Sequence, residues 1–258
     1  MKIIIALIAA LSVGGVGGWS LGNSQPSAAE QMNNPHNRVP VATDMPLATD
    51  FISLRPALDT LPTESLSETE LQGLRYMREE EKLARDVYST LYDQWSLPIF
   101  ANIAQSEQTH TEAVRDLLEK YQIADPVTDD SIGVFTNPDL QQLYTDLTAS
   151  GATSVEEALR VGALIEDLDL FDLAQEIKNT NNQDIVLVYQ NLMRGSRNHM
   201  RSFISQLDAR GESYTPQHIS QSEFDEIVAS DKERGGGQTS RNGNTLGSGG
   251  GGRGWGNR

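Results

Sequence analysis

The chain has 258 residues, no cysteine and a formal net charge of −16. The absence of cysteine excludes disulfides, thiolate metal sites and cysteine nucleophiles. An acidic chain repels nucleic acid and anionic membranes and attracts cations, although a need for solubility would also explain the charge. Metal ions are therefore plausible partners, and nucleic acid is not.

The first 29 residues have the layout of a secretory signal. Lys2 is followed by the apolar run IIIALIAALSVGGVGG, and the small residues SAA stand before Glu30. We therefore expect export to the periplasm or the extracellular space. The alternative is an N-terminal membrane anchor, because residues 3–22 are long enough to span a bilayer.

Two further segments differ in composition from a folded domain. Residues 30–66 are rich in proline and show no sustained period, so we expect a linker there. Residues 232–258 consist mainly of glycine with arginine, asparagine and serine, a composition that buries too little apolar surface to fold. We expect one domain over residues 67–211, a C-terminal extension over 212–231 and a disordered tail after it.

The pattern of apolar residues within this domain is helical, and strand signals are nearly absent. Ser67 with Glu70, and Ser154 with Glu157, have the spacing of helix-capping boxes. The fold class is thus predicted to be all-α, a four-helix bundle with a short extra helix in the connection between the second and third long helices. The expected long helices cover residues 67–95, 98–121, 154–179 and 182–209, and the short one covers 138–148.

Each long helix has an inward stripe that is apolar except at its middle. An ionised carboxylate on such a stripe costs several kcal/mol unless it is paired or bound to a metal. The stripes place no lysine or arginine at the same depth, which favours a cation over a salt-bridge network as the neutralising partner. The polar mid-stripe residues are Glu81, then Glu107 and His110, then Glu166 and Asp169, then Ser196 and His199.

Glu107 and His110 form an ExxH pair, whose spacing directs an oxygen and a nitrogen ligand from one helical face. Together with Glu81, Glu166, Asp169 and His199, this pair predicts a site for two metal ions bridged by carboxylates. Mixed oxygen and imidazole ligation suits iron or manganese, and zinc is an alternative. Glu80 replaces Glu81 as a ligand if the first helix is rotated.

Several other polar residues have two interpretations. Tyr88, one heptad after Glu81, is either a core tyrosine or a hydrogen-bond partner of a ligand. Arg85 and Asp86 are expected near the ligands, where charged groups orient them. His218 lies outside the four stripes and is expected to be solvated.

The motifs resemble those of the ferritin-like superfamily, in its rubrerythrin-like arrangement. Residues 81–88, EKLARDVY, are similar to the first-helix pattern of that group, and SEQTH at 106–110 is similar to its ExxH helix. Glu166 and Asp169 fall where a rubrerythrin-like protein has two carboxylates three residues apart, and His199 resembles its second histidine. The segments EEEKLARDVY, NIAQSEQTH and GSRNHMRSF resemble still more closely a bacterial and archaeal family of ferritin-like domains of unknown function.

This resemblance, which spans about residues 70–208, implies a non-haem diiron or manganese redox protein acting on peroxide, oxygen or ferrous iron. An external electron donor is then required, because an attached rubredoxin-like module would need cysteines. Ser196 departs from the pattern, since a full second ExxH motif would have glutamate there. The alternatives are a non-catalytic metal-sequestering protein and a purely structural bundle. A homodimer is compatible with the sequence but is not read from it.

Overall fold

The computed structural model describes residues 54–233, and the described chain is all-α. The expected leader (1–29), most of the expected linker (30–53) and the tail beyond residue 233 lie outside the described residues. None of the helices between residues 54 and 233 is long and apolar enough to cross a membrane.

The observed helices agree with the expected ones to within three residues at each end. The short helix between the second and third long helices is present and extends to Gly151. The helices are α2 Leu54–Thr60, α3 Glu68–Trp95, α4 Pro98–Lys120, α5 Pro138–Gly151, α6 Val155–Lys178, α7 Gln183–Asp208 and α8 Gln221–Ala229.

Local side-chain chemistry fixes the ends of the long helices. Ser67 accepts a hydrogen bond from the backbone N–H of Glu70, and the Glu70 carboxylate accepts one from the backbone of Ser67, so the capping box that starts α3 is complete. Helix α4 begins with Pro98 in its first turn. After α7 the chain turns at Gly211, whose φ of 73° lies in the left-handed region that glycine adopts without strain.

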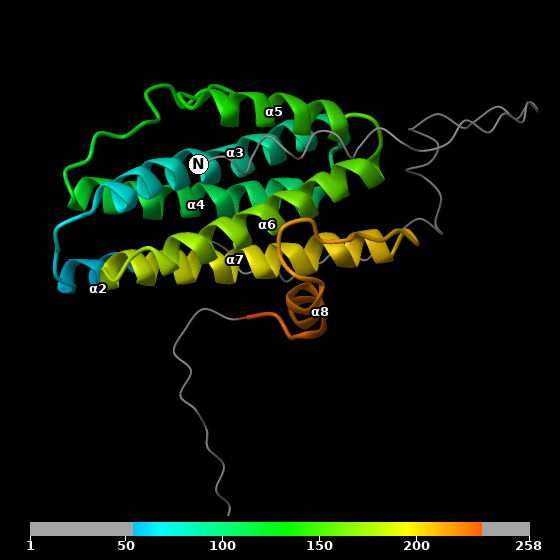
Figure 1. The fold of residues 1–258 in the computed structure, drawn as a ribbon. Helices are drawn as coiled ribbons and strands as arrows, with labels where there is room; N and C mark the ends of the chain where they lie inside the picture. The colour runs from blue at the N-terminus through cyan, green and yellow to red at the C-terminus, as the bar shows by residue number, and fades with distance from the viewer. Residues whose placement is uncertain (1–53, 234–258) are drawn as a thin grey trace, which may run out of the picture.

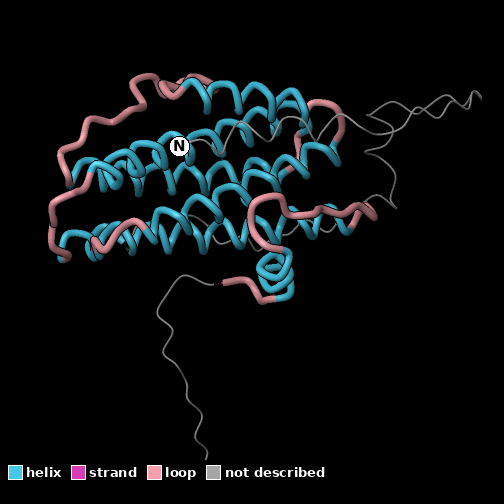
Figure 2. The backbone as a smooth tube through the Cα atoms, in the orientation of Figure 1, coloured by secondary structure: helices cyan, strands magenta, loops and turns pink. Residues whose placement is uncertain are grey.

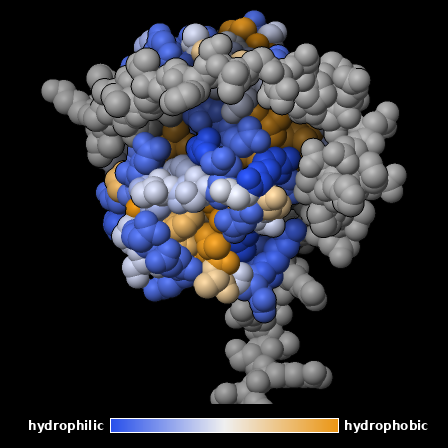
Figure 3. Space-filling model, turned by 90° about the vertical axis from the view of Figure 1, so that its right-hand side faces the viewer, coloured by the Kyte–Doolittle hydropathy of each residue, from blue (hydrophilic) through white to orange (hydrophobic). Residues whose placement is uncertain are grey.

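The four long helices form a bundle in which α3 packs on α4, α4 on α7, α7 on α6 and α6 on α3. Helix α5 lies along α3 and α6 on the outside of this bundle, as Figure 1 shows. The tube in Figure 2 makes clear that long loops occur between α4 and α5 and between α7 and α8. The face drawn in Figure 3 is mainly hydrophilic, with smaller hydrophobic patches, as expected of an acidic chain.

The bundle core is split into two apolar clusters by a polar layer. One cluster includes Tyr88, Phe100 and Phe203, and the other includes Met77 and Leu192. The polar mid-stripe residues lie between these clusters along their helices and are all buried. Apolar packing on both sides therefore holds the polar groups in place and excludes water from them.

Two segments outside the expected 67–211 domain pack onto the bundle. Helix α2 lies within the segment expected to be a linker and buries Leu54 and Leu58, while Lys120 donates hydrogen bonds to backbone carbonyls at its end. In the C-terminal extension, α8 buries Phe224 and Ile227 in the core.

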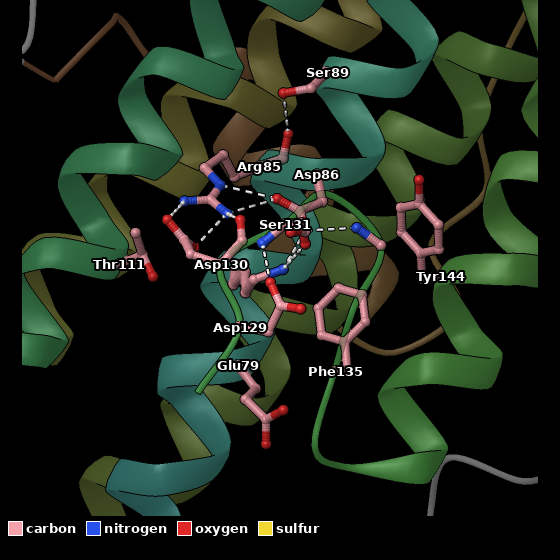
Figure 4. Close-up of polar contacts among 12 residues, drawn as sticks. Glu79, Arg85, Asp86, Ser89, Thr111, Asp129, Asp130, Ser131, Phe135 and Tyr144 are labelled. Carbon is pink, nitrogen blue, oxygen red and sulfur yellow. Dashed lines mark hydrogen bonds and ion pairs between the residues drawn. The ribbon is translucent and has the colours of Figure 1, made fainter. Parts of the chain in front are cut away.

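The loop between α4 and α5, residues 121–137, is anchored by charged residues on the outer face of α3 (Figure 4). Lys82 is fully buried, and its Nζ lies 2.5 Å from Asp86 Oδ2 and 2.9 Å from the Ser131 carbonyl oxygen. Arg85 joins Asp86 to Asp130 at 2.8 Å each. Arg85 also donates to Gln108 Oε1 on α4 at 2.7 Å, next to Glu107 in the sequence. The contacts of Arg85 and Asp86 thus involve this loop and a neighbour of a candidate ligand.

Candidate metal centre

Glu107 lies at the middle of the buried polar layer. It extends from α4 and is 2% exposed. Its Oε2 lies 2.7 Å from His110 Nδ1, and its Oε1 lies 2.7 Å from His199 Nδ1. One carboxylate thus faces two imidazoles, one from its own helix and one from α7.

Each oxygen of Glu107 belongs to a separate group of possible ligand atoms. Glu81 and His110 complete the first group, and Glu81 Oε2 lies 3.2 Å from His110 Nδ1. Glu166 and His199 complete the second, and Glu166 Oε2 lies 3.5 Å from His199 Nδ1. Within each group the three ligand atoms lie within 4.8 Å of one another, so each group could hold a metal ion.

Asp169 belongs to neither group of three, but it lies close enough to Glu81 and Glu166 to affect their shared electrostatics. The Ser196 hydroxyl donates a hydrogen bond to Asp169 Oδ2. The serine that stands in place of a second-motif glutamate therefore orients a carboxylate from the neighbouring helix.

Three further residues hold the ligand side chains in position. The Tyr88 hydroxyl donates to Glu166 Oε1 at 2.5 Å, so Tyr88 touches a candidate ligand. His199 Nε2 lies 3.0 Å from the Ser106 hydroxyl, a contact that leaves Nδ1 pointing at the centre. Gly195 provides space for a ring, because a Cβ there would lie 2.4 Å from the imidazole of His110.

The protonation states of the centre are strongly perturbed. Burial raises the pKa of Glu81 to about 7 despite the opposing effect of His110. Burial also raises the pKa of Asp169 well above its usual range. Burial disfavours the Glu107 anion, yet the imidazoles of His110 and His199 outweigh burial and lower the pKa of Glu107. Burial likewise disfavours the His199 cation, but the carboxylates of Glu107 and Glu166 raise the pKa of His199 to about 9.

The donor set fits metal ions better than it fits a closed hydrogen-bond network. Three buried atoms of the layer form no hydrogen bond with any residue that the structure describes: Glu81 Oε1, Asp169 Oδ1 and His199 Nδ1. The contact between His199 and Glu107 is close enough for an ion pair but lacks hydrogen-bond geometry. Four carboxylates also face two imidazoles, so without a metal the charge balances only if carboxyl groups hold protons, as the raised pKa values of Glu81 and Asp169 indicate. Two divalent ions would balance the carboxylates with neutral imidazoles.

All six residues predicted from the sequence as ligands lie in this layer. Sequence reasoning missed Ser106 and Gly195, which act on the histidine rings from other helices, although Gly195 inside a helix was a visible signal. It also left Glu80 as an alternative to Glu81. The structure buries both, with Glu81 facing His110 and Glu80 facing Asp172 on α6.

Four long helices around a buried layer of carboxylates and imidazoles define a helical-bundle protein with a candidate metal centre. The model of the uncharacterised protein domain DUF2202 matches residues 70–231. The chain therefore belongs to the DUF2202 family.

A protein of Methanocaldococcus jannaschii, the uncharacterised protein MJ0754, is 58% identical over 178 residues, which cover 69% of this chain and 96% of the relative. The crystal structure of the hypothetical protein MJ0754 from the same organism matches with a TM-score of 0.67 at 58% identity, over 67% of this chain and 99% of that chain. Neither name states an activity.

Proposed function

We propose that this chain is an exported metal protein in which Glu107 bridges two ions of iron or manganese. The observation that carries the proposal is the geometry of that carboxylate, whose two oxygens face two separate pairs of glutamate and histidine. A carboxylate shared between two such groups is the arrangement found in carboxylate-bridged sites of ferritin-like bundles. Export rests on the leader-like residues 1–29 alone.

The bound ions would supply redox chemistry with a small oxidant, peroxide or oxygen, or with ferrous iron as substrate. The burial of the ligands supports small reactants, because the six ligand side chains are between 2% and 7% exposed. Tyr88 would hold Glu166 in place through its hydroxyl and is itself packed against Phe100 and Phe203. Since the chain has no cysteine, the reducing equivalents would come from an external donor.

Elemental analysis of the full chain, expressed with iron and manganese present, tests the metal site. We expect about two ions per chain in the wild type and a loss of at least one in Glu107→Gln. The matched control is Glu112→Gln, an exposed glutamate on the same helix, which should keep the full complement. A full complement in Glu107→Gln would refute the bridging role.

A second measurement separates redox function from metal sequestration, the alternative that the same burial also supports. The iron-loaded chain is mixed with peroxide under a reductant, and peroxide consumption and the absorption spectrum are followed. Repeated consumption with a spectral change supports the redox function. Bound metal without turnover would leave a sequestering protein.

A further inference from the structure

A row of acidic side chains leads away from the candidate metal centre along α6. Asp169, Asp172 and Glu176 follow Glu166 at intervals of three and four residues, so they lie on one helical face. Asp169 is buried, whereas Asp172 and Glu176 are partly exposed. The row therefore passes from the interior toward the surface.

Glu80 on α3 lies opposite this row. It is 4% exposed and close to the carboxyl groups of both Asp172 and Asp169, and the Tyr76 hydroxyl lies 3.5 Å from Glu80 and from Asp172. Glu80 Oε2 is buried and receives no hydrogen bond from the described residues. When Glu80 is protonated, its carboxyl group can share that proton with Asp172. A buried oxygen with this environment is a position where a cation would be stabilised.

Within residues 54–233, no lysine or arginine of α3 to α7 forms an ion pair with the row. The ion pairs that lysines and arginines of α3 to α7 form involve other acids, such as Asp86, Asp125 and Asp184. The imidazole of His218 lies close enough to Asp172 to favour its carboxylate form, and its buried Nε2 makes no hydrogen bond with residues 54–233. Oxygen and nitrogen atoms, rather than ammonium groups, thus line the row.

At the outer end of the row, the Glu176 carboxylate lies against Gly73 of α3, where there is no side chain. A Cβ at this position would lie 2.0 Å from Glu176 Oε2, so α3 makes space there for the Glu176 side chain. The acidic groups form a series from the partly exposed Glu176, through Asp172 and Glu80, to Asp169 beside the centre.

We propose that Glu176, Asp172 and Glu80 form the path by which divalent cations reach the buried centre between α3 and α6. The path rests on the proposed function, because it assumes that the centre takes up metal. Burial raises the pKa of all three acids, so an arriving cation competes with their protons. In their ionised form, carboxylates in a low-dielectric seam raise the local cation concentration and increase the rate of uptake by about tenfold or more. They do not add to the number of ions held at equilibrium.

The test follows uptake of cobalt(II), whose absorption changes on binding, by the metal-free full chain after rapid mixing. The variant Glu80→Gln with Asp172→Asn removes two acids from the path. Its matched control, Asp93→Asn with Glu112→Gln, removes two exposed acids and so makes the same change in net charge. Asp172→Glu is a second control, because it keeps the charge of the path. If the double variant does not fold, the single variant Asp172→Asn tests the path at a partly exposed residue.

We expect uptake by the double path variant to be slower by about tenfold or more, with the final cobalt content unchanged. The control and Asp172→Glu should stay within about twofold of the wild type. Uptake by the path variant at the control rate would overturn the proposal. A lower final content would overturn it as well, because Glu80 and Asp172 would then be ligands. Failure of the wild type to bind cobalt would instead refute the metal function itself, before any variant is compared.

Discussion

The metal-free chain should lose stability as the pH rises from about 6 to about 9. The unfolded-state pKa of His199 is near 6.5, and in the fold the anions of Glu107 and Glu166 raise it to about 9 against the effect of burial. The folded chain therefore binds this proton more tightly than the unfolded chain does. Its contribution is fully present below about 6.5 and is lost as the pH rises through about 9.

The size of this loss follows from the two pKa values. At about 1.4 kcal/mol per pKa unit, the His199 proton contributes on the order of 3 kcal/mol. Glu81 acts in the same direction at lower pH, because burial raises its pKa from 4.5 to about 7 and its contribution is lost between these values. The folded centre thus favours protons throughout the range in which metal ions compete with them.

The assay is urea unfolding of the chelator-treated full chain, followed by far-ultraviolet circular dichroism at several pH values with and without manganese(II). Metal should reverse the trend, because deprotonated ligands bind it more tightly as the pH rises. His199→Gln should reduce the slope above about pH 7, whereas His218→Gln, outside the centre, should keep it. A metal-free stability that is flat or rises over this range would contradict the electrostatic argument.

Four further predictions concern single residues. Gly195→Ala should displace His110, lower the metal content in elemental analysis and cost about 1–3 kcal/mol in urea unfolding, because the new Cβ overlaps the buried ring. Tyr88→Phe should weaken metal binding about 10- to 100-fold in a chelator competition, since Glu166 loses its 2.5 Å donor; unchanged affinity would make Tyr88 a packing residue only. Asp86→Ala should cost about 3–5 kcal/mol by stranding the buried Lys82 charge, with the metal content of the folded fraction unchanged. Asp167→Asn should expose the C-terminal extension to limited proteolysis, because Asp167 accepts hydrogen bonds from Tyr214 and three backbone N–H groups; wild-type resistance would refute this role.

The long helices could be predicted because their determinants are local. Ser67 and Glu70 cap α3 through contacts three residues apart, and Pro98 begins α4. The helical period also brought Glu107 and His110 to one face. Because both signals act within one helix, the sequence was sufficient to place them.

The supporting residues could not be predicted because their partners are distant in the sequence. Lys82 and Asp86 are buried by Ser131 and Gly133, which lie more than forty residues away in the loop before α5. The stripes alone did not identify these partners. Helix α2 was missed for a related reason: seven residues are too few to show a period, and its stability comes from contacts such as that of Lys120 with its carbonyls.

The most direct measurement of the central claim is anomalous diffraction from crystals of the metal-loaded chain, recorded at the absorption edge of the bound metal. The account predicts two anomalous peaks on either side of Glu107, one beside Glu81 and His110 Nδ1 and the other beside Glu166 and His199 Nδ1. A single peak away from Glu107, or no peak in a crystal of the loaded protein, would contradict it.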